Sequence, residues 1–308
     1  MTRVATADNW NSALLDLMGA QRRQFDAQRQ VSDQRVAVDL KGFGRTSETL
    51  TAFNTAKARL DGHVETNKSV AQRLETQNLA LERVADAAVG ARQQIADALA
   101  VDRAEGMMQG IRNWYLQFQD ALNAKHQGRY LFAGARVDQP PFQAETMAEL
   151  AASPTVDELF VNDDLKAASR LDDATTVETG FLANEIGRDL AEIFRDIQNF
   201  ENGPNGPLTG KLTDAQRTFL EGLLSRFETQ HDRVLESVAR NGALQKRVET
   251  NMDSLTAQSN SLETLIGEKA EVDMAEAITR LQQAQVAVQA SAQILSQLKN
   301  TTLLDLLR

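Results

Sequence analysis

All five prolines of this 308-residue chain lie between positions 140 and 207. Proline removes a backbone donor and breaks the interior of a helix. The 139 residues before this segment and the 101 residues after it therefore contain no residue that forbids a long helix. Both parts are rich in Ala, Leu, Gln, Glu and Arg, which favour helices. The distribution predicts two long helical arms on either side of a different kind of middle segment.

An apolar repeat with a spacing of seven runs through each arm. In the first arm it falls on Phe53, Leu60, Asn67, Leu74, Leu81, Ala88 and Ile95. In the second arm it falls on Leu220, Phe227, Val234, Asn241, Val248, Leu255 and Leu262. Such a spacing keeps one stripe facing one partner, as in a coiled coil. We expect residues 47–103 and 216–266 to form an antiparallel helical hairpin, with Asn67 and Asn78 favouring one register.

The predicted fold is mainly α: an elongated helical-hairpin or coiled-coil bundle from the N- and C-terminal arms, with a small β-containing middle domain. The expected parts are an N-terminal assembly helix and turn (1–46), the first half of the bundle (47–134), a variable β or irregular middle domain (135–182), the second half of the bundle (183–267) and a C-terminal assembly helix (268–308). Leu159-Phe160-Val161 is the best strand candidate. Gly267 marks the expected break before the last helix.

The two terminal segments carry apolar stripes that the hairpin does not cover. In the first segment, residues at helical spacing are Leu14, Met18 and Phe25. In the last segment, the stripe comprises Ile278, Leu281, Ala284, Val288, Leu295 and Leu298. An amphipathic helix at a chain end has no core of its own, so its stripe needs a partner. We expect these two helices to pair and to form the subunit interface with neighbouring copies or relatives.

The formal net charge of −10 is concentrated in residues 140–207, which hold 4 Lys and Arg against 14 Asp and Glu. An acidic chain lacks the positive face that binding to nucleic acid requires. The absence of cysteine excludes disulfides and thiolate metal sites. We expect no membrane span and no cleaved secretory signal, because the chain lacks a run of about 20 apolar residues and a basic segment followed by an apolar one.

No pattern of residues predicts catalysis, a metal site or a cofactor. The three histidines are not at metal-ligand spacing: His63, His126 and His231. Residues 42–47 lack the spacer and the Lys-Ser/Thr ending of a phosphate loop, which favours a turn between helices. The acidic pairs at 163–164 and 172–173 lack the glycine-punctuated ligand series of a calcium loop, so we interpret them as solvated loops. We therefore expect a protein that is not an enzyme.

The run Gly128-Arg129-Tyr130-Leu131-Phe132-Ala133-Gly134 follows a predicted helix and precedes Pro141-Phe142. This run resembles the signature of bacterial flagellar hook–filament junction proteins, which are members of the flagellin-like superfamily. Residues 267–281 and the leucines near the end resemble the terminal helix that flagellins and junction proteins share, and Arg3-Val4-Ala5-Thr6 is similar to their start. One departure lies at residues 32–46, where the Asp-Asp-Pro element of the family is missing.

The resemblance implies a structural adaptor that joins the hook, through another hook-associated protein, to the flagellin filament. Its implied partners are flagellin, the other hook-associated protein, further copies in a ring, the flagellar export apparatus and an export chaperone. The implied location is extracellular, at the hook–filament junction, reached without a cleaved signal peptide. Two alternatives stay open: a flagellin that forms the filament itself, and an intracellular coiled-coil scaffold or chaperone-like binding module.

Overall fold

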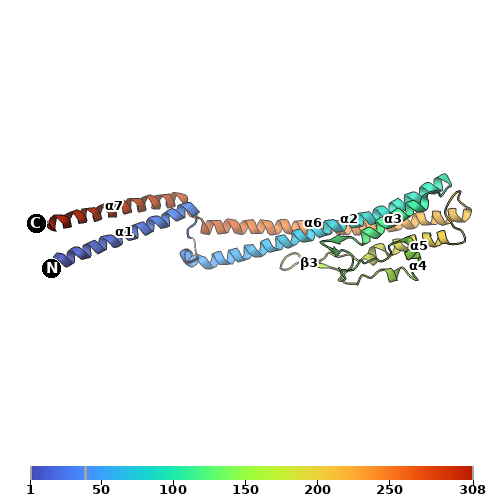
Figure 1. Ribbon diagram of the computed structural model, residues 1–308, viewed down its shortest axis with the longest axis horizontal. Helices are drawn as coiled ribbons and strands as arrows, with labels where there is room; N and C mark the ends of the chain where they lie inside the picture. Colours follow the sequence, from blue (N-terminus) through green and yellow to red (C-terminus); the bar gives the residue numbers. More distant parts are fainter. Residues whose placement is uncertain (1, 38–39, 307–308) are drawn as a thin grey trace. The chain divides into compact units, whose positions relative to one another are not determined.

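The computed structural model describes the backbone of residues 2–37 and 40–306 and the side chains of residues 10–37 and 42–297. These residues form two compact units (Figure 1). One unit contains residues 1–60 and 257–308, and the other contains residues 61–256. Two long helices, α2 (Ser47–Val101) and α6 (Asp214–Ala270), contribute to both units.

The terminal unit is built on two helices that lie side by side, α1 (Thr2–Asp33) and α7 (Met274–Leu306). A short antiparallel bridge joins Arg35 to Glu271 at one end of the pair. The most buried side chains of both helices are alanines: Ala20, Ala27, Ala277 and Ala284. Small side chains let two helix backbones approach closely, so the alanines allow close packing of α1 and α7.

Helix α6 continues three residues past the glycine that was expected to break the chain. Helix α6 runs through Gly267 and ends at Ala270, and α7 begins at Met274. A glycine inside a helix costs only about 1 kcal/mol, which does not stop a 57-residue helix. The break is instead fixed by Asp273, whose Oδ1 accepts the Ala275 N–H at 2.9 Å and so caps α7.

The connection from α1 to α2 lies within the segment that was expected to hold a helix and a turn (1–46). Helix α1 ends at Asp33, and Gln34 takes a positive φ of 55°. A 3₁₀ turn, η1 (Leu40–Thr46), leads into α2, in line with the predicted turn between helices. The hydroxyls of Thr46 and Ser47 do not accept from the first turn of α2. They donate backwards, to the carbonyls of Phe43 and Gly44.

In the unit of residues 61–256, α2 and α6 run antiparallel, as predicted. Gln77 pairs with Asn241, and Arg92 pairs with Glu228, so residue numbers fall along α6 as they rise along α2. The repeat positions are buried throughout this unit: Leu74, Leu81, Ala88, Ile95, Leu220, Phe227, Val234, Val248 and Leu255. The spacing of seven is therefore the packing seam between the two helices.

Two further helices, α3 (Met107–Leu122) and α5 (Ala183–Asn202), pack against this pair around an aromatic core. Phe194 lies at its centre, with ring centroids 5.4 Å from Tyr115, 5.6 Å from Phe118 and 5.7 Å from Phe227. Edge-to-face and tilted aromatic contacts of this kind favour one fixed arrangement of the rings. Tyr115 also donates its hydroxyl to the Ala144 carbonyl at 2.8 Å.

The strands of this unit form two short antiparallel hairpins, and only the second lies within the expected middle domain of residues 135–182. The first pairs β1 (Lys125–His126) with β2 (Arg129–Tyr130), and the second pairs β3 (Ala168–Arg170) with β4 (Thr176–Glu178). A short helix, α4 (Met147–Ala152), and a 3₁₀ turn, η2 (Asp157–Leu159), lie between the hairpins.

The strand predicted at residues 159–161 is wrong. Leu159 ends η2, and Phe160 makes only an isolated bridge with Phe142. The bridge is closed by bonds from Gln143 N to Leu159 O and from Val161 N to Pro141 O. Because Pro141 has no N–H to donate, the ladder cannot continue past it. The predicted class, mainly α with long helical arms and a small β-containing middle, is confirmed.

Candidate assembly surface

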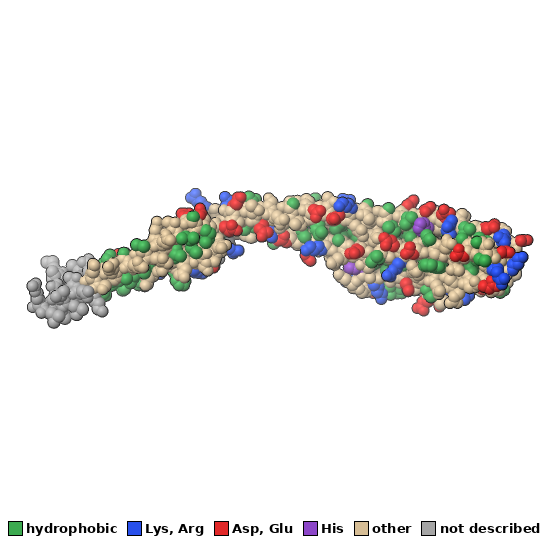
Figure 2. All heavy atoms as spheres, turned by 90° about the horizontal axis from the view of Figure 1, so that it is seen from above, with side chains coloured by type: hydrophobic (Ala, Val, Ile, Leu, Met, Phe, Trp, Pro, Cys, Tyr) green, Lys and Arg blue, Asp and Glu red, His purple; other side chains and the backbone are tan. Residues whose placement is uncertain are grey.

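Helix α1 carries an exposed apolar stripe. The stripe comprises Trp10, Leu14, Met18 and Phe25. Because an α-helix turns by about 100° per residue, these four positions lie within a quarter of the helix circumference. Phe25 is 66% exposed, Met18 is 54% exposed and Leu14 is 42% exposed. Figure 2 shows hydrophobic side chains along this helix pair with few charged ones among them. A contiguous apolar surface of this kind is typical of a site for another protein chain.

The residues predicted on the last helix fall on two different faces of α7. Ala284 is buried, and Leu281, Val288 and Leu295 are half-buried, so these four line the seam against α1. Ile278 is 44% exposed and lies outside that seam. Leu298 lies outside the described side chains. The structure thus brings the two predicted stripes onto one helix pair, but Leu14, Met18 and Phe25 point away from α7 rather than into the seam.

Helix α7 also contains a long run of uncharged residues, which the spacing of its large apolar residues did not indicate. The 18 residues from 281 to 298 contain no Asp, Glu, Lys or Arg. The exposed positions in this run include Val286, Ile294 and several glutamines. Burying an uncharged surface costs far less than burying charges, which must first lose their hydration. The run of uncharged residues was the signal in the sequence that marked this face as suited to burial by a partner.

The motif residues Gly128 to Gly134 connect two helices in the unit of residues 61–256. Leu131 N bonds to Ala124 O at the end of α3, and Ala183 N at the start of α5 bonds to Phe132 O. Phe132 and Ala133 are completely buried. The motif therefore ties the end of α3 to the beginning of α5. Two of its side chains, Arg129 and Tyr130, remain at the surface of β2, where they are exposed and half-buried respectively.

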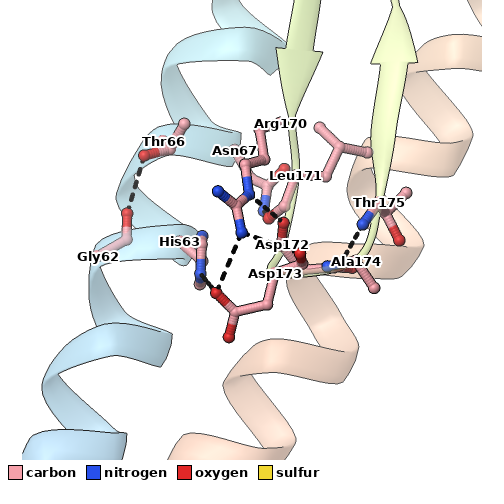
Figure 3. Close-up of polar contacts among 10 residues, drawn as sticks. All are labelled: Gly62, His63, Thr66, Asn67, Arg170, Leu171, Asp172, Asp173, Ala174 and Thr175. Atoms are coloured by element: carbon pink, nitrogen blue, oxygen red, sulfur yellow. Dashed lines mark hydrogen bonds and ion pairs between the residues drawn. The ribbon is translucent and has the colours of Figure 1, made fainter.

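The acidic pairs of the middle segment serve the local fold. Figure 3 shows the turn between β3 and β4 held against α2, with Asn67 donating to the Leu171 carbonyl at 2.8 Å and His63 Nε2 lying 3.3 Å from Asp173 Oδ1. Asp172 accepts the N–H groups of Ala174 and Thr175. The bond from Ala174 is the main reason that the pKa of Asp172 lies below its ordinary value.

Asn67 has a different role from the one expected. It was predicted to set the register of the two long helices, but its amide reaches the β3–β4 turn instead. Asp163 likewise accepts from the N–H groups of Ala135 and Leu165, which lowers its pKa. Across the part of the chain that the structure describes, no three His, Asp or Glu side chains converge as a metal-binding group. None of the described helices is long and apolar enough to cross a membrane.

The comparisons with known proteins agree with this geometry. Residues 224–307 match the family of the bacterial flagellin C-terminal helical region. A structure from Vibrio parahaemolyticus, described as a flagellar hook-associated protein, is similar with a TM-score of 0.60 and 13% identity over 73% of this chain and 97% of the other. FlgL of Bacillus cereus is similar with a TM-score of 0.54 and 18% identity over 70% of this chain and 98% of the other.

No functionally curated protein matched the sequence. The matched C-terminal region contains the second half of α6 and the charge-free helix α7. It therefore includes one of the two helices that form the candidate surface. Residues 224–307 therefore match the flagellin C-terminal helical region, and the fold of the chain is similar to that of the two flagellar structures.

Proposed function

We propose that this protein is a structural adaptor of the bacterial flagellum that joins the hook, through another hook-associated protein, to the flagellin filament. The observation that carries the proposal is the exposed stripe of Trp10, Leu14, Met18 and Phe25 beside the charge-free helix α7, in a chain with the hook-associated fold. An adaptor needs a surface that stays unsatisfied in the single chain and is covered in the assembly.

The proposed assembly acts through the terminal parts of the chain, residues 1–46 and 268–308. Residues 47–134 and 183–267 form the bundle, and residues 135–182 form the variable middle domain. The stripe on α1 is the face for other subunits, and the seam residues Leu281, Ala284 and Val288 hold α7 against α1 so that both helices present one surface. Burying several large apolar side chains contributes roughly 1.5–3 kcal/mol each, enough to drive association.

The partners in this proposal are flagellin on one side, another hook-associated protein on the other, and further copies of the chain in a ring. The chain would leave the cell through the flagellar export apparatus, with an export chaperone covering the apolar helices before export, and would reside outside the cell at the hook–filament junction. The sequence has no cysteine, so no disulfide can trap it during such a passage.

A flagellin that forms the filament itself is the second candidate, because the C-terminal family is named for flagellin. Electron microscopy of a deletion strain separates the two functions. Loss of a junction adaptor should leave an intact hook and release monomeric flagellin into the medium. Loss of a sole flagellin leaves no filament protein to release.

An intracellular coiled-coil scaffold is the third candidate, since long paired helices also occur in such proteins. Fractionation addresses it with the wild-type strain. The adaptor should be recovered with flagella sheared from the cells, together with filament protein. Recovery in the cell interior alone would contradict the proposal.

A further inference from the structure

A cavity of about 660 Å³ lies in the unit of residues 61–256. One side is α2, with Ser69, Val70 and Arg73. A second side is the β1–β2 hairpin and the motif that follows it, and a third is β3 with Gly180. The volume lies in the range of sites for small ligands, which are usually concave and contain a few convergent polar groups.

The lining of this cavity has an unusual charge for so acidic a chain. It contains Arg73, Arg129 and His126, and none of its lining residues is Asp or Glu. Lys125 adds positive charge nearby, since its Nζ lies 4.4 Å from the centroid of the Tyr130 ring. Across the described residues, neither Arg73 nor Arg129 forms an ion pair with a carboxylate. The cavity therefore presents uncompensated positive charge.

Arg73 is held in place by neutral groups. Its Nη2 donates to Ser169 Oγ at 3.0 Å and also to Thr179 Oγ1, while its Nε is buried without a partner. Burial lowers the pKa of the Arg73 guanidinium from its ordinary value, since no anion offsets the lost hydration. The guanidinium group is therefore held in position by hydroxyl groups, and no carboxylate neutralises its charge.

His126 also lines this cavity. Thr76 Oγ1 lies 3.0 Å from the Gln72 carbonyl oxygen and 3.0 Å from His126 Nδ1, and the second contact holds the imidazole ring in place. His126 Nε2 is buried and has no partner.

We propose that this cavity binds a small ligand through an oxyanion group, a carboxylate or a phosphate, held by Arg73 and Arg129. Guanidinium groups are suited to oxyanions because their donors match two oxygens at once. The body of the ligand would contact the apolar part of the lining, which includes Val70, Leu131 and Val137. The motif thereby gains a role beyond its structural one, because its Arg129 and Leu131 belong to the site.

The test is a titration of the full ¹⁵N-labelled chain, followed by NMR at constant ionic strength. Sulfate stands for a phosphorylated or sulfated ligand, and acetate stands for a carboxylated one. We expect saturable shifts of the Arg73 Nε–H signal and of the Leu131 and Gly134 amides with at least one probe. The probe that binds more tightly identifies the class of oxyanion.

Three variants define the site. Arg73→Gln should abolish saturable binding, and Arg129→Gln should weaken it about tenfold, because each removes a charge-assisted hydrogen bond. Arg129 is exposed and has no ion pair among the described residues, so its variant keeps the fold intact. Arg112→Gln, at an exposed position of α3, is the matched control and should leave binding unchanged. Shifts that never saturate, or that Arg112→Gln and Arg129→Gln alter equally, would overturn the proposal.

Discussion

Gln77 on α2 donates a hydrogen bond to Asn241 on α6 at 2.9 Å, and both side chains are buried in the seam between the two long helices. Asn241 in turn donates to the Leu74 carbonyl at 2.9 Å, and Gln77 also reaches the Thr179 carbonyl at 3.2 Å. This polar layer joins α2, α6 and the residue that follows β4. A buried polar pair is satisfied in one alignment only, so it fixes the register of the helices.

Asn241→Ala should destabilise the protein by about 1–3 kcal/mol, because Gln77 loses one of its two acceptors and the Leu74 carbonyl loses a donor in a buried environment. Chemical denaturation followed by circular dichroism measures the change. Asn199→Ala, at an exposed position of α5, is the matched control and should change the free energy of unfolding by less than about 0.5 kcal/mol. Equal effects of the two variants would show that the layer does not stabilise the fold.

Tyr115 should make stability depend on pH in the alkaline range. Burial raises the pKa of its phenol above the ordinary value of about 10 in the unfolded chain, and the charge of Glu149 adds to the shift. Because the pKa of Tyr115 is higher in the folded than in the unfolded chain, the neutral phenol contributes to the free energy of unfolding in full below about pH 10. This contribution is lost as the pH rises further. The phenolate absorbance of Tyr115 should therefore appear together with unfolding.

Tyr115→Phe removes this alkaline loss, at a cost near neutral pH of roughly 0.5–1.5 kcal/mol for the bond to the Ala144 carbonyl. Thermal denaturation of both proteins across the alkaline range provides the comparison. A wild-type protein and a Phe variant with the same slope against pH would contradict the assignment.

Gly134 and Gly128 both have positive φ values, 67° and 80°, but only one of them is crowded. A Cβ on Gly134 would lie 2.0 Å from Asp163 Oδ1, which the N–H groups of Ala135 and Leu165 hold in place. A Cβ on Gly128 would meet no atom within 4 Å. Gly128→Ala should cost about 1 kcal/mol for backbone strain alone, and Gly134→Ala should cost clearly more. Melting temperatures of the two variants test this order.

Phe25→Asp should weaken assembly at least tenfold while leaving the single chain as stable as the wild type. Phe25 is exposed in the chain, so the charge is tolerated there, but it would be buried without a partner in the assembly. Ser12→Asp, at an exposed position on another side of α1, is the matched control. The measurement is the number of flagella with filaments in complemented deletion strains, with purified protein checked by thermal denaturation.

Val288→Asp tests the seam between α1 and α7 independently of the exposed stripe on α1. Val288 is half-buried on the side of α7 that packs on α1, so a charge there should disrupt the helix pair and abolish assembly. The unit of residues 61–256 should keep its own thermal transition, because its core does not include α7. Normal filaments on cells that carry this variant would show that the seam is not needed.

Much of the helical architecture could be predicted from the sequence, because a spacing of seven and the confinement of proline are local signals. Leu74 and Phe227 occupy the seam that their spacing indicates. The small strands could not be placed, because segments of two or three residues form only where the surrounding core holds them. The candidate strand at residues 159–161 has suitable side chains, but its neighbour Pro141 cannot extend the ladder.

The sequence indicates which helices form the candidate surface, but not which side of each helix is buried and which is exposed. Met18 and Phe25 mark an apolar stripe, yet the seam on α1 runs through the small residues Ala20 and Ala27, which carry little weight in a pattern of large apolar residues. The oxyanion cavity could not be predicted at all. Arg73 and Arg129 are far apart in the sequence, and only the position of the β1–β2 hairpin beside α2 brings them to one cavity.

The central claim is that this chain forms the junction between hook and filament, and immunogold labelling of intact isolated flagella tests it most directly. An antibody against the acidic middle segment, residues 135–182, is suited to the purpose because the proposed assembly leaves this segment accessible. A junction protein should give gold particles confined to the distal end of the hook. Gold particles distributed along the filament would contradict this claim and identify the chain as a filament subunit.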